Sequence, residues 1–317
     1  MTCAGKESTM ATPPTRWVIG VDLSSTSRGA LLFADWLSRH TDEGWRPEFT
    51  PVHVLDEKLL KERLRFENRE ELVGKHLDKT IELLQELGVD DSLGKPQVVA
   101  GWKTEQELEE ELFSPKSSGL VIGRRAESEG FHLIHLGKVA RRLLHSVPAP
   151  VIVVPPDLEA DTIGKGPLIV LEDRSVGTRN ACRMALDLAD RLGRIVKLVR
   201  VVSPQGAIAT GGRITPAVVD THLEQREDML NEMDSWLDVN GLQAVEAQVI
   251  YGTMPGELLK LCNESNAVML LASCRRLTLF ERLLQDDPCS QLASAVARPF
   301  MAVPPEENRS YSVSTTK

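Results

Sequence analysis

The chain has 317 residues, about twice the usual length of a single domain, so each half is long enough to bury its own core. Its net charge of -9 argues against nucleic acid and anionic lipid as partners, because both repel an acidic surface. The longest apolar runs, such as Val151 to Val154, have strand length and cannot span a bilayer. The segment from Met1 to Thr15 lacks the apolar run of a secretion signal, so we expect a cytoplasmic protein.

The first half alternates short β-rich runs with amphipathic helical stretches. Its predicted strands are Trp17–Asp22, Phe49–Leu55, Gln97–Gly101, Leu120–Gly123 and Pro150–Val154. Its predicted helices are Ser27–Arg39, a long charged Leu60–Leu87, Thr104–Leu112 and Lys138–His145. Asp22-Leu23-Ser24-Ser25 supplies capping side chains where the first strand turns into the first helix.

The second half repeats this alternation. Its predicted strands are Leu168–Leu171, Ile195–Val202, Ala247–Tyr251, Val268–Ala272 and Phe300–Val303. Its predicted helices are Thr178–Leu192, Ala217–Val239, Pro255–Cys262 and Pro288–Ala297. The pattern predicts an α/β fold: two tandem five-stranded, mainly parallel open-sheet domains of Rossmann-type layers.

Matching residues recur at a long, nearly constant separation along the sequence, which indicates a duplicated domain rather than a solenoid. Asp22 recurs as Asp173 and Gly101 as Gly252, whereas Gly123 falls opposite Ala272 at a slightly shorter step. We therefore predict a first domain over residues 16–156, a polar linker over 157–166, a second domain over 167–305 and a disordered tail over 306–317.

The fifth strands, Val151–Val154 and Phe300–Val303, are apolar, preceded by proline and followed by Pro-Pro. An exposed apolar edge strand invites aggregation, and pairing it with its counterpart across a pseudo-two-fold axis removes the hazard. We expect the halves to pack face to face as an internal pseudo-dimer with these strands near one another. A homodimer of the whole chain also stays open.

The five cysteines show no CxxC pair and no histidine at zinc spacing. In a reducing compartment we expect most of them to be free thiols. Cys182 lies among apolar residues at helical spacing and is interpreted as a core residue. Cys274, in a predicted loop, is the one candidate for a reactive thiol.

Open parallel α/β sheets bind ligands beyond the carboxyl ends of their strands. Those ends carry Asp22, Val54, Gly101 and the segment from Gly123 to Lys138. With the closing proline-flanked strand, this arrangement resembles the universal stress protein family, in the tandem class that has two such domains in one chain. The resemblance extends from Trp17 to Pro305 and implies a role in stress response.

ATP-binding members of that family carry Gly-x2-Gly-x9-Gly-(Ser/Thr), whose small residues let backbone N–H groups surround phosphates at a helix start. Here Gly123 and Gly137 match the outer glycines, but Ala126 replaces the middle one, one extra residue precedes Gly137, and Lys138 replaces the hydroxyl. That the glycines merely form a tight loop stays an open alternative.

The resemblance implies a role for each matching residue. Asp22 and Val54 would hold the adenine of ATP, the cofactor considered for the first domain. Gly123, Gly130 and Gly137 would hold its phosphates. Positive charge would come from Arg124, Arg125 and Lys138.

The second half has lost this motif. Ala272-Ser273-Cys274-Arg275 replaces Gly-x2-Gly, and Asp286-Asp287 replaces Gly-(Ser/Thr). A like charge at about 4 Å from a phosphate costs roughly 4 kcal/mol at an effective dielectric near 20. We expect no nucleotide in this half unless a metal bridges the charges.

No catalytic triad, carboxylate dyad or metal-ligand cluster is evident in the sequence, so no catalytic or metal-binding residues are predicted. Gly137-Lys138 resembles the end of a P-loop but lacks its upstream glycine and following hydroxyl. We therefore predict a non-enzymatic tandem protein that binds a nucleotide, another small anionic or apolar ligand, or a partner. The alternative is an ATP-binding regulatory switch with a single site in the first domain.

Overall fold

The structure is a computed structural model, and it describes residues 16–41, 47–63, 68–113, 117–124, 136–146, 149–203, 216–274 and 288–305. The predicted tail over 306–317, Gly130 and Asp286-Asp287 lie outside the described residues. No helix of the described portion is long and apolar enough to cross a membrane.

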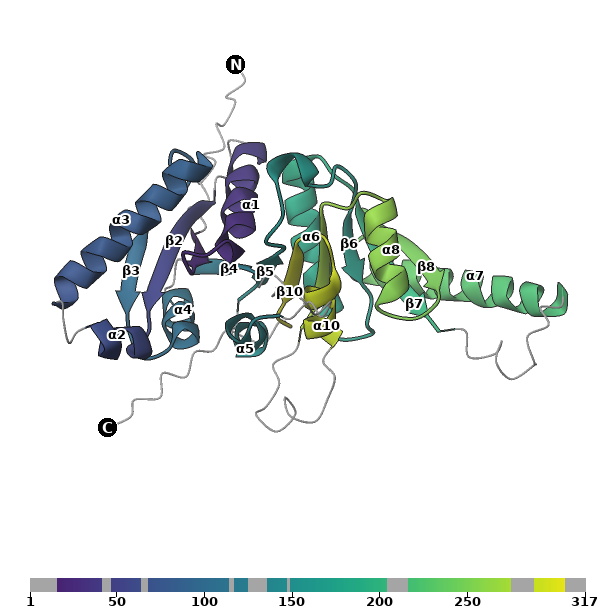
Figure 1. The fold of residues 1–317 in the computed structure, drawn as a ribbon. Helices are drawn as coiled ribbons and strands as arrows, with labels where there is room; N and C mark the ends of the chain where they lie inside the picture. The colour runs from purple at the N-terminus through teal and green to yellow at the C-terminus, as the bar shows by residue number, and fades with distance from the viewer. Residues whose placement is uncertain are drawn as a thin grey trace, which may run out of the picture.

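One continuous sheet forms the centre of the molecule (Figure 1). Its strand order is β3-β2-β1-β4-β5-β10-β9-β6-β7-β8, so the second half mirrors the order of the first. The strands are β1 (Arg16–Val21), β2 (Glu48–Leu55), β3 (Gln97–Ala100), β4 (Ser117–Gly123), β5 (Val151–Val154), β6 (Leu168–Leu171), β7 (Val196–Val202), β8 (Val245–Tyr251), β9 (Met269–Ser273) and β10 (Phe300–Val303). Within each half all pairings are parallel, which confirms the predicted α/β fold.

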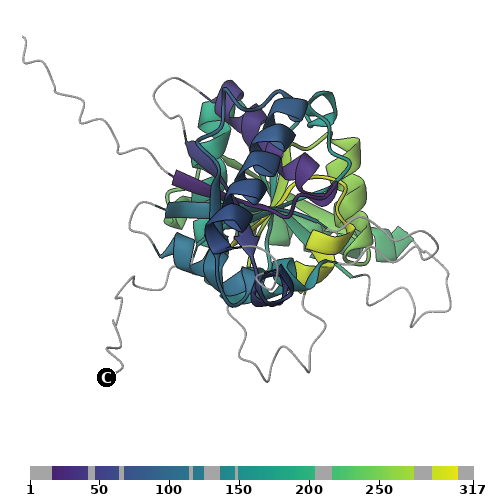
Figure 2. The same ribbon diagram turned by 60° about the vertical axis from the view of Figure 1, so that its left-hand side comes forward.

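Helices cover both faces of this sheet, as Figure 2 shows with the first domain turned forward. The first domain contributes α1 (Thr26–His40), α2 (Glu57–Arg63), α3 (Arg69–Leu87), α4 (Thr104–Leu112) and α5 (Lys138–Ser146). The second contributes α6 (Thr178–Leu192), α7 (Pro216–Val239), α8 (Gly256–Glu264) and α10 (Pro288–Ala295). The prediction of one long helix over Leu60–Leu87 is wrong. Asn68 starts a new helix there, because its side chain accepts a hydrogen bond from Glu71 N–H (2.7 Å) as an N-cap.

The two domains meet at the predicted pair of strands. β5 and β10 pair antiparallel, with Met301 opposite Ile152, so each closes the free edge of the other. The domains therefore join edge to edge in one sheet, and the expected face-to-face packing is wrong. Backbone hydrogen bonding across the junction satisfies N–H and C=O groups that face-to-face packing would leave unpaired.

Two apolar layers run across the junction, one on each face of the sheet. Ile152 and Met301 lie in the layer that packs against α1, α3, α6 and α7, whereas Val153 and Phe300 lie in the layer under α4, α5, α8 and α10. Every residue of β5 and β10 is buried. Since each layer contains side chains from both domains, the burial of apolar surface stabilises the pair as one unit.

The predicted linker is packed against both domains. Leu158 and Ile163 are buried in the first of these layers, and a short 3-10 turn, η1 (Ala160–Thr162), lies between them. A Cβ atom on Gly164 would lie 2.0 Å from the carbonyl oxygen of Ala267. The segment therefore follows the protein surface closely instead of acting as a free spacer.

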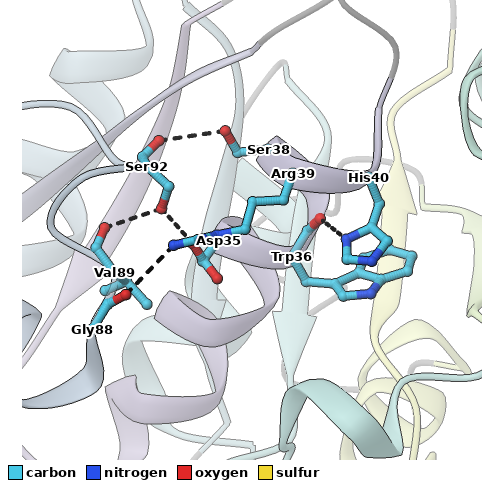
Figure 3. Close-up of polar contacts among 8 residues, drawn as sticks. All are labelled: Asp35, Trp36, Ser38, Arg39, His40, Gly88, Val89 and Ser92. Carbon is cyan, nitrogen blue, oxygen red and sulfur yellow. Dashed lines mark hydrogen bonds and ion pairs between the residues drawn. The ribbon is translucent and has the colours of Figure 1, made fainter.

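A polar network joins the end of α1 to the turn after α3, at the opposite edge of the sheet from the predicted site (Figure 3). Arg39 Nε donates to Asp35 Oδ1 (2.6 Å) and its Nη2 to Gly88 O (3.5 Å). Ser92 Oγ donates to the same Asp35 carboxylate. The Asp35 carboxylate raises the pKa of Arg39, which keeps this ion pair charged.

Candidate functional site

Asp22 holds the turn between β1 and α1. Its Oδ1 accepts hydrogen bonds from Ser24 N–H (3.0 Å), Ser24 Oγ (2.7 Å) and Ser27 Oγ (2.7 Å), while Leu23 has a φ of 58°. In the second domain Asp173 Oδ1 accepts from Ser175 N–H and Thr178 Oγ1, and Arg174 has a φ of 60°. The same turn is built twice, but neither N-cap residue, Ser25 or Gly177, makes a side-chain hydrogen bond to its helix, so the aspartates hold the strand-to-helix turn instead of capping the helix as predicted.

The exposed Asp22 carboxylate lies at the carboxyl end of the sheet. No hydrogen bond recorded among the described residues uses its Oδ2, so this oxygen can accept one from a ligand. Val54 is on the neighbouring strand, directly after the residue opposite Val21, and its side chain is buried under this edge. The structure thus brings Asp22 and Val54 to adjacent strand ends, as the sequence predicted.

His53, the residue before Val54 on β2, is buried and makes two hydrogen bonds. Its Nδ1 lies 2.8 Å from Val21 O, and since a carbonyl only accepts, Nδ1 carries the proton. Its Nε2 then accepts from His76 Nδ1 of α3, 3.0 Å away. Burial lowers the pKa of His53, with Lys79 adding to this effect and the Val21 carbonyl and Asp22 opposing it. His53 is thus held neutral as a bridge from β1 to α3.

We expect this histidine to make the protein less stable in acid. Because the pKa of His53 is lower in the folded state than its ordinary value of 6.5, the unfolded chain binds more protons just below that pH. The contribution is complete above about pH 6.5 and is lost as the pH falls toward the folded-state pKa. Urea unfolding from pH 8 to 5 should show the decline, with a shallower slope for His53→Asn. His40→Gln, at the opposite sheet edge, serves as control, and an unchanged slope in His53→Asn would contradict the assignment.

Gly123 ends β4 in close contact with the start of α1. A Cβ atom on Gly123 would lie 1.9 Å from the carbonyl oxygen of Thr26. Backbone packing alone therefore demands glycine here, as the tight-loop alternative supposed. Whether Gly123 also contacts a phosphate stays a prediction.

Backbone pairing corrects the correspondence between the two halves. Arg124 N–H donates to Val154 O (2.8 Å), and Cys274 N–H donates to Val303 O (2.9 Å). Arg124 is therefore the counterpart of Cys274, and Gly123 corresponds to Ser273 rather than to Ala272. The sequence comparison misplaced a one-residue shift, because only the hydrogen bonds of the ladder fix the register.

Arg124 does not supply the phosphate charge expected of it. Its side chain is buried, and its Nη1 donates to Ser294 O (2.8 Å) and Val296 O (2.7 Å) at the end of α10. A cation at a helix C-terminus satisfies carbonyl groups that lack intrahelical partners. Arg124 thus joins the first domain to the second. Arg125 lies outside the described residues.

The far end of the predicted phosphate segment is Gly137 and Lys138. Gly137 precedes α5 and its carbonyl accepts the N–H of Arg141 (3.0 Å), so it caps the first turn of that helix. Lys138 is the first residue of α5 and is exposed. Gly123 and Gly137 therefore flank the segment as predicted, and Lys138 is the cation available at its end.

Trp102 is a residue that the sequence reasoning missed. It follows β3 at the same edge of the sheet, and its side chain is 61% exposed. Lys61 Nζ lies 5.6 Å from the ring centroid, and Glu107 Oε1 accepts the Trp102 N–H (3.1 Å), which fixes the backbone. An exposed indole at this edge offers a stacking surface. No motif marks it in the sequence.

The second domain carries a disulfide at the corresponding edge. Cys274, directly after β9, is bonded to Cys289 in the first turn of α10, with the Cα atoms 6.1 Å apart. The expectation of mostly free thiols is therefore wrong for this pair. Cys182 and Cys262 are free and buried, and burial raises the pKa of each thiol to about 12, which makes both inert.

The described part of the chain holds no group of three His, Cys, Asp or Glu side chains arranged to bind a metal ion. At the carboxyl edge of the first domain it presents instead the Asp22 carboxylate, the Lys138 ammonium group and the exposed indole of Trp102. This set suits hydrogen bonding, charge pairing and stacking with a small ligand.

Comparisons with known proteins show similarity to one family and its fold. Residues 167–304 match the model of the Universal stress protein family. A universal stress protein from Archaeoglobus fulgidus aligns with 92% of this chain and 99% of its own, at 16% identity and a TM-score of 0.65. A putative universal stress protein from Pseudomonas aeruginosa aligns with 92% of this chain and 93% of its own, at 13% identity and a TM-score of 0.55.

A further universal stress protein from Archaeoglobus fulgidus, solved in complex with dAMP, aligns with 44% of this chain and 97% of its own, at 15% identity and a TM-score of 0.28. A comparison with curated protein sequences gave no match. Residues 167–304 thus match the Universal stress protein family by sequence, and the chain as a whole, first domain included, shares the fold of the solved Archaeoglobus fulgidus protein.

Proposed function

We propose that this protein acts in stress response by binding a small ligand at the carboxyl edge of its first domain, without catalysis. The observation that carries the proposal is the contrast between the two domains. Both build the aspartate turn, but only the first follows it with Val54, a glycine-flanked segment and Lys138. The second has a disulfide at the corresponding position.

The chemistry of the edge favours a nucleotide as the ligand. Asp22 Oδ2 suits the N–H donors of a base, the indole of Trp102 suits stacking, and Lys138 suits a phosphate. Because Arg124 is engaged with α10, the site has less positive charge than the sequence implied. We therefore expect weak binding that favours a nucleoside monophosphate over ATP.

An ATP-dependent switch is the second candidate, supported by Gly137 and Lys138 at the start of α5. We expect negligible hydrolysis in either case. Phosphoryl transfer needs a positioned nucleophile and metal ions that neutralise developing charge, and Asp22 already holds the β1–α1 turn.

Equilibrium dialysis with labelled ATP and AMP tests the proposal on the intact protein. Asp22→Asn keeps an oxygen that accepts from Ser24 and Ser27 but removes the charge from the ligand side. Loss of a charge-assisted hydrogen bond costs about 1.5–3 kcal/mol, so we expect binding to weaken by about tenfold or more. Asp173→Asn makes the same change in the equivalent turn and should leave binding unaltered.

Binding that survives Asp22→Asn but is lost in Asp173→Asn would contradict the assignment to the first domain. Absence of binding by both nucleotides at millimolar concentration would exclude the nucleotide and leave another small anionic or apolar ligand, or a protein partner, as the ligand. Steady phosphate release from ATP that disappears in Asp22→Asn would overturn the non-catalytic part of the proposal.

A further inference from the structure

Helix α10 is held at both of its ends by contacts outside itself. In its first turn, Cys289 is bonded to Cys274, which follows β9. At its other end, the carbonyl oxygens of Ser294 in the last turn and of Val296 just after it accept hydrogen bonds from Arg124 of the first domain. The helix also packs beside α5 across the domain junction (Figure 1). One eight-residue helix therefore connects a disulfide in one domain to the strand end of the other.

The first domain builds the same unit without a disulfide. Arg124 stands at the position of Cys274, as the ladder hydrogen bonds show. α5 buries Ala140 and Leu143 at the spacing with which α10 buries Cys289 and Leu292, so Ala140 is the counterpart of Cys289. Since the first domain has the same strand, helix and packing with arginine and alanine at these positions, a unit of this kind folds without a disulfide.

We propose that the Cys274–Cys289 disulfide is a reversible redox link, whose reduction loosens α10 and, through Arg124, the strand end of the first domain. A cross-link that the fold does not need can be broken without unfolding the domain. Cys289 lies in the first turn of α10, where backbone N–H groups lack intrahelical partners and local opening is easiest.

The co-reactant is a dithiol reductant. One of its thiolates attacks a protein sulfur, the S–S bond breaks, and the other cysteine leaves as a thiolate that takes up a proton. The second reductant thiolate then displaces the remaining cysteine. The protein gains two electrons and two protons, and the reductant departs as its own disulfide.

The effect passes to the first domain through defined contacts. Arg124 N–H donates to Val154 of β5, and its guanidinium reaches α10. Freeing the start of α10 lets the helix shift, and the carbonyls at its end move with it. Arg124 is the residue directly after Gly123, so the change reaches the candidate site. Only this last step, the change at the candidate site, depends on the proposed function.

Hydrogen exchange of the full chain, followed by mass spectrometry with and without dithiothreitol, tests the link. We expect reduction to speed amide exchange by about tenfold in 288–296 and also in 117–124. Oxidised glutathione should restore slow exchange, and the far-UV spectrum should stay unchanged. A Cys274→Ser, Cys289→Ala double variant, which has alanine as in α5, should exchange fast in both conditions.

The Arg124→Met variant separates the loosening of α10 from its transmission to the first domain. In that variant, reduction should still speed exchange in 288–296 but no longer alter 117–124. The proposal is overturned if reduction leaves 288–296 unchanged, if the wild-type response is confined to the second domain, or if reduction unfolds the protein. Since the readout is backbone exchange without ligand, failure of nucleotide binding would not affect the outcome.

Discussion

Met301→Pro is expected to destroy the junction between the two domains. Met301 lies in β10, which pairs with β5 on one side and β9 on the other, so its N–H faces a neighbouring strand. Proline removes that donor and adds a ring that the ladder cannot accommodate. With the loss of a buried side chain, we expect a cost of about 3–5 kcal/mol, a large share of a typical stability of about 5–15 kcal/mol. Urea unfolding monitored by circular dichroism measures it.

Two variants serve as controls. Met301→Leu keeps the volume and the N–H, and should cost less than about 1.5 kcal/mol. Val98→Pro places proline in the edge strand β3, where Gly101 N–H donates to Leu55 O and the alternate amide of Val98 points away from β2. We expect it to be tolerated much better. Equal destabilisation by the two prolines would contradict the central position of β10 in the sheet.

The strand pairing at the junction was predictable because its signal is local. Four consecutive apolar residues between prolines cannot stay exposed, and two copies of such a strand can pair with each other. The same holds for the alternation of strands and helices, since each element carries its own apolar pattern. The geometry of the contact was not predictable, because edge-to-edge and face-to-face packing bury the same strands.

Features that depend on partners elsewhere in the sequence could not be predicted from the sequence. The disulfide joins cysteines 15 positions apart, and nothing in either residue's neighbourhood indicates the pairing. Arg124 reaches carbonyls about 170 positions away, so its local context suggested a phosphate ligand instead. A buried cation finds whichever acceptors the fold brings close, and only the three-dimensional structure identifies them.

The candidate site also contains both predictable and unpredictable features. Asp22 and Val54 lie at adjacent strand ends, which was predictable because parallel strands bring their carboxyl ends to one edge, whereas their contact with a ligand stays a prediction. The His53–His76 pair was missed because each histidine lies in a different element and belongs to no motif. At the corresponding position of the second domain an ion-pair network replaces the histidine pair. There Arg200 on β7 donates to Glu172 (2.8 Å) and Glu232 (2.8 Å). Duplication preserved the backbone positions while the polar contacts diverged.

Gly123→Ala is expected to destabilise the first domain by about 3 kcal/mol, although it adds a single methyl group. That methyl would lie 1.9 Å from Thr26 O, and a backbone atom cannot rotate away as a side chain can. The start of α1 would have to move, but Ser27 Oγ holds it by donating to Asp22 (2.7 Å). The midpoint of urea unfolding measures the loss.

Gly74→Ala is the matched control in the same domain. Gly74 lies inside α3, and apart from the backbone of its own helix no atom lies within 4 Å of an added Cβ, so alanine should stabilise the helix by up to about 1 kcal/mol. A cost below about 0.5 kcal/mol for Gly123→Ala would contradict the close approach of β4 and α1.

Because the displaced α1 turn carries Asp22, the Gly123→Ala variant should also lose ligand binding, even if Gly123 makes no contact with a phosphate. A phosphate role for Gly123 therefore cannot be inferred from its alanine variant, and the Asp22 and Asp173 pair remains the cleaner probe of the site.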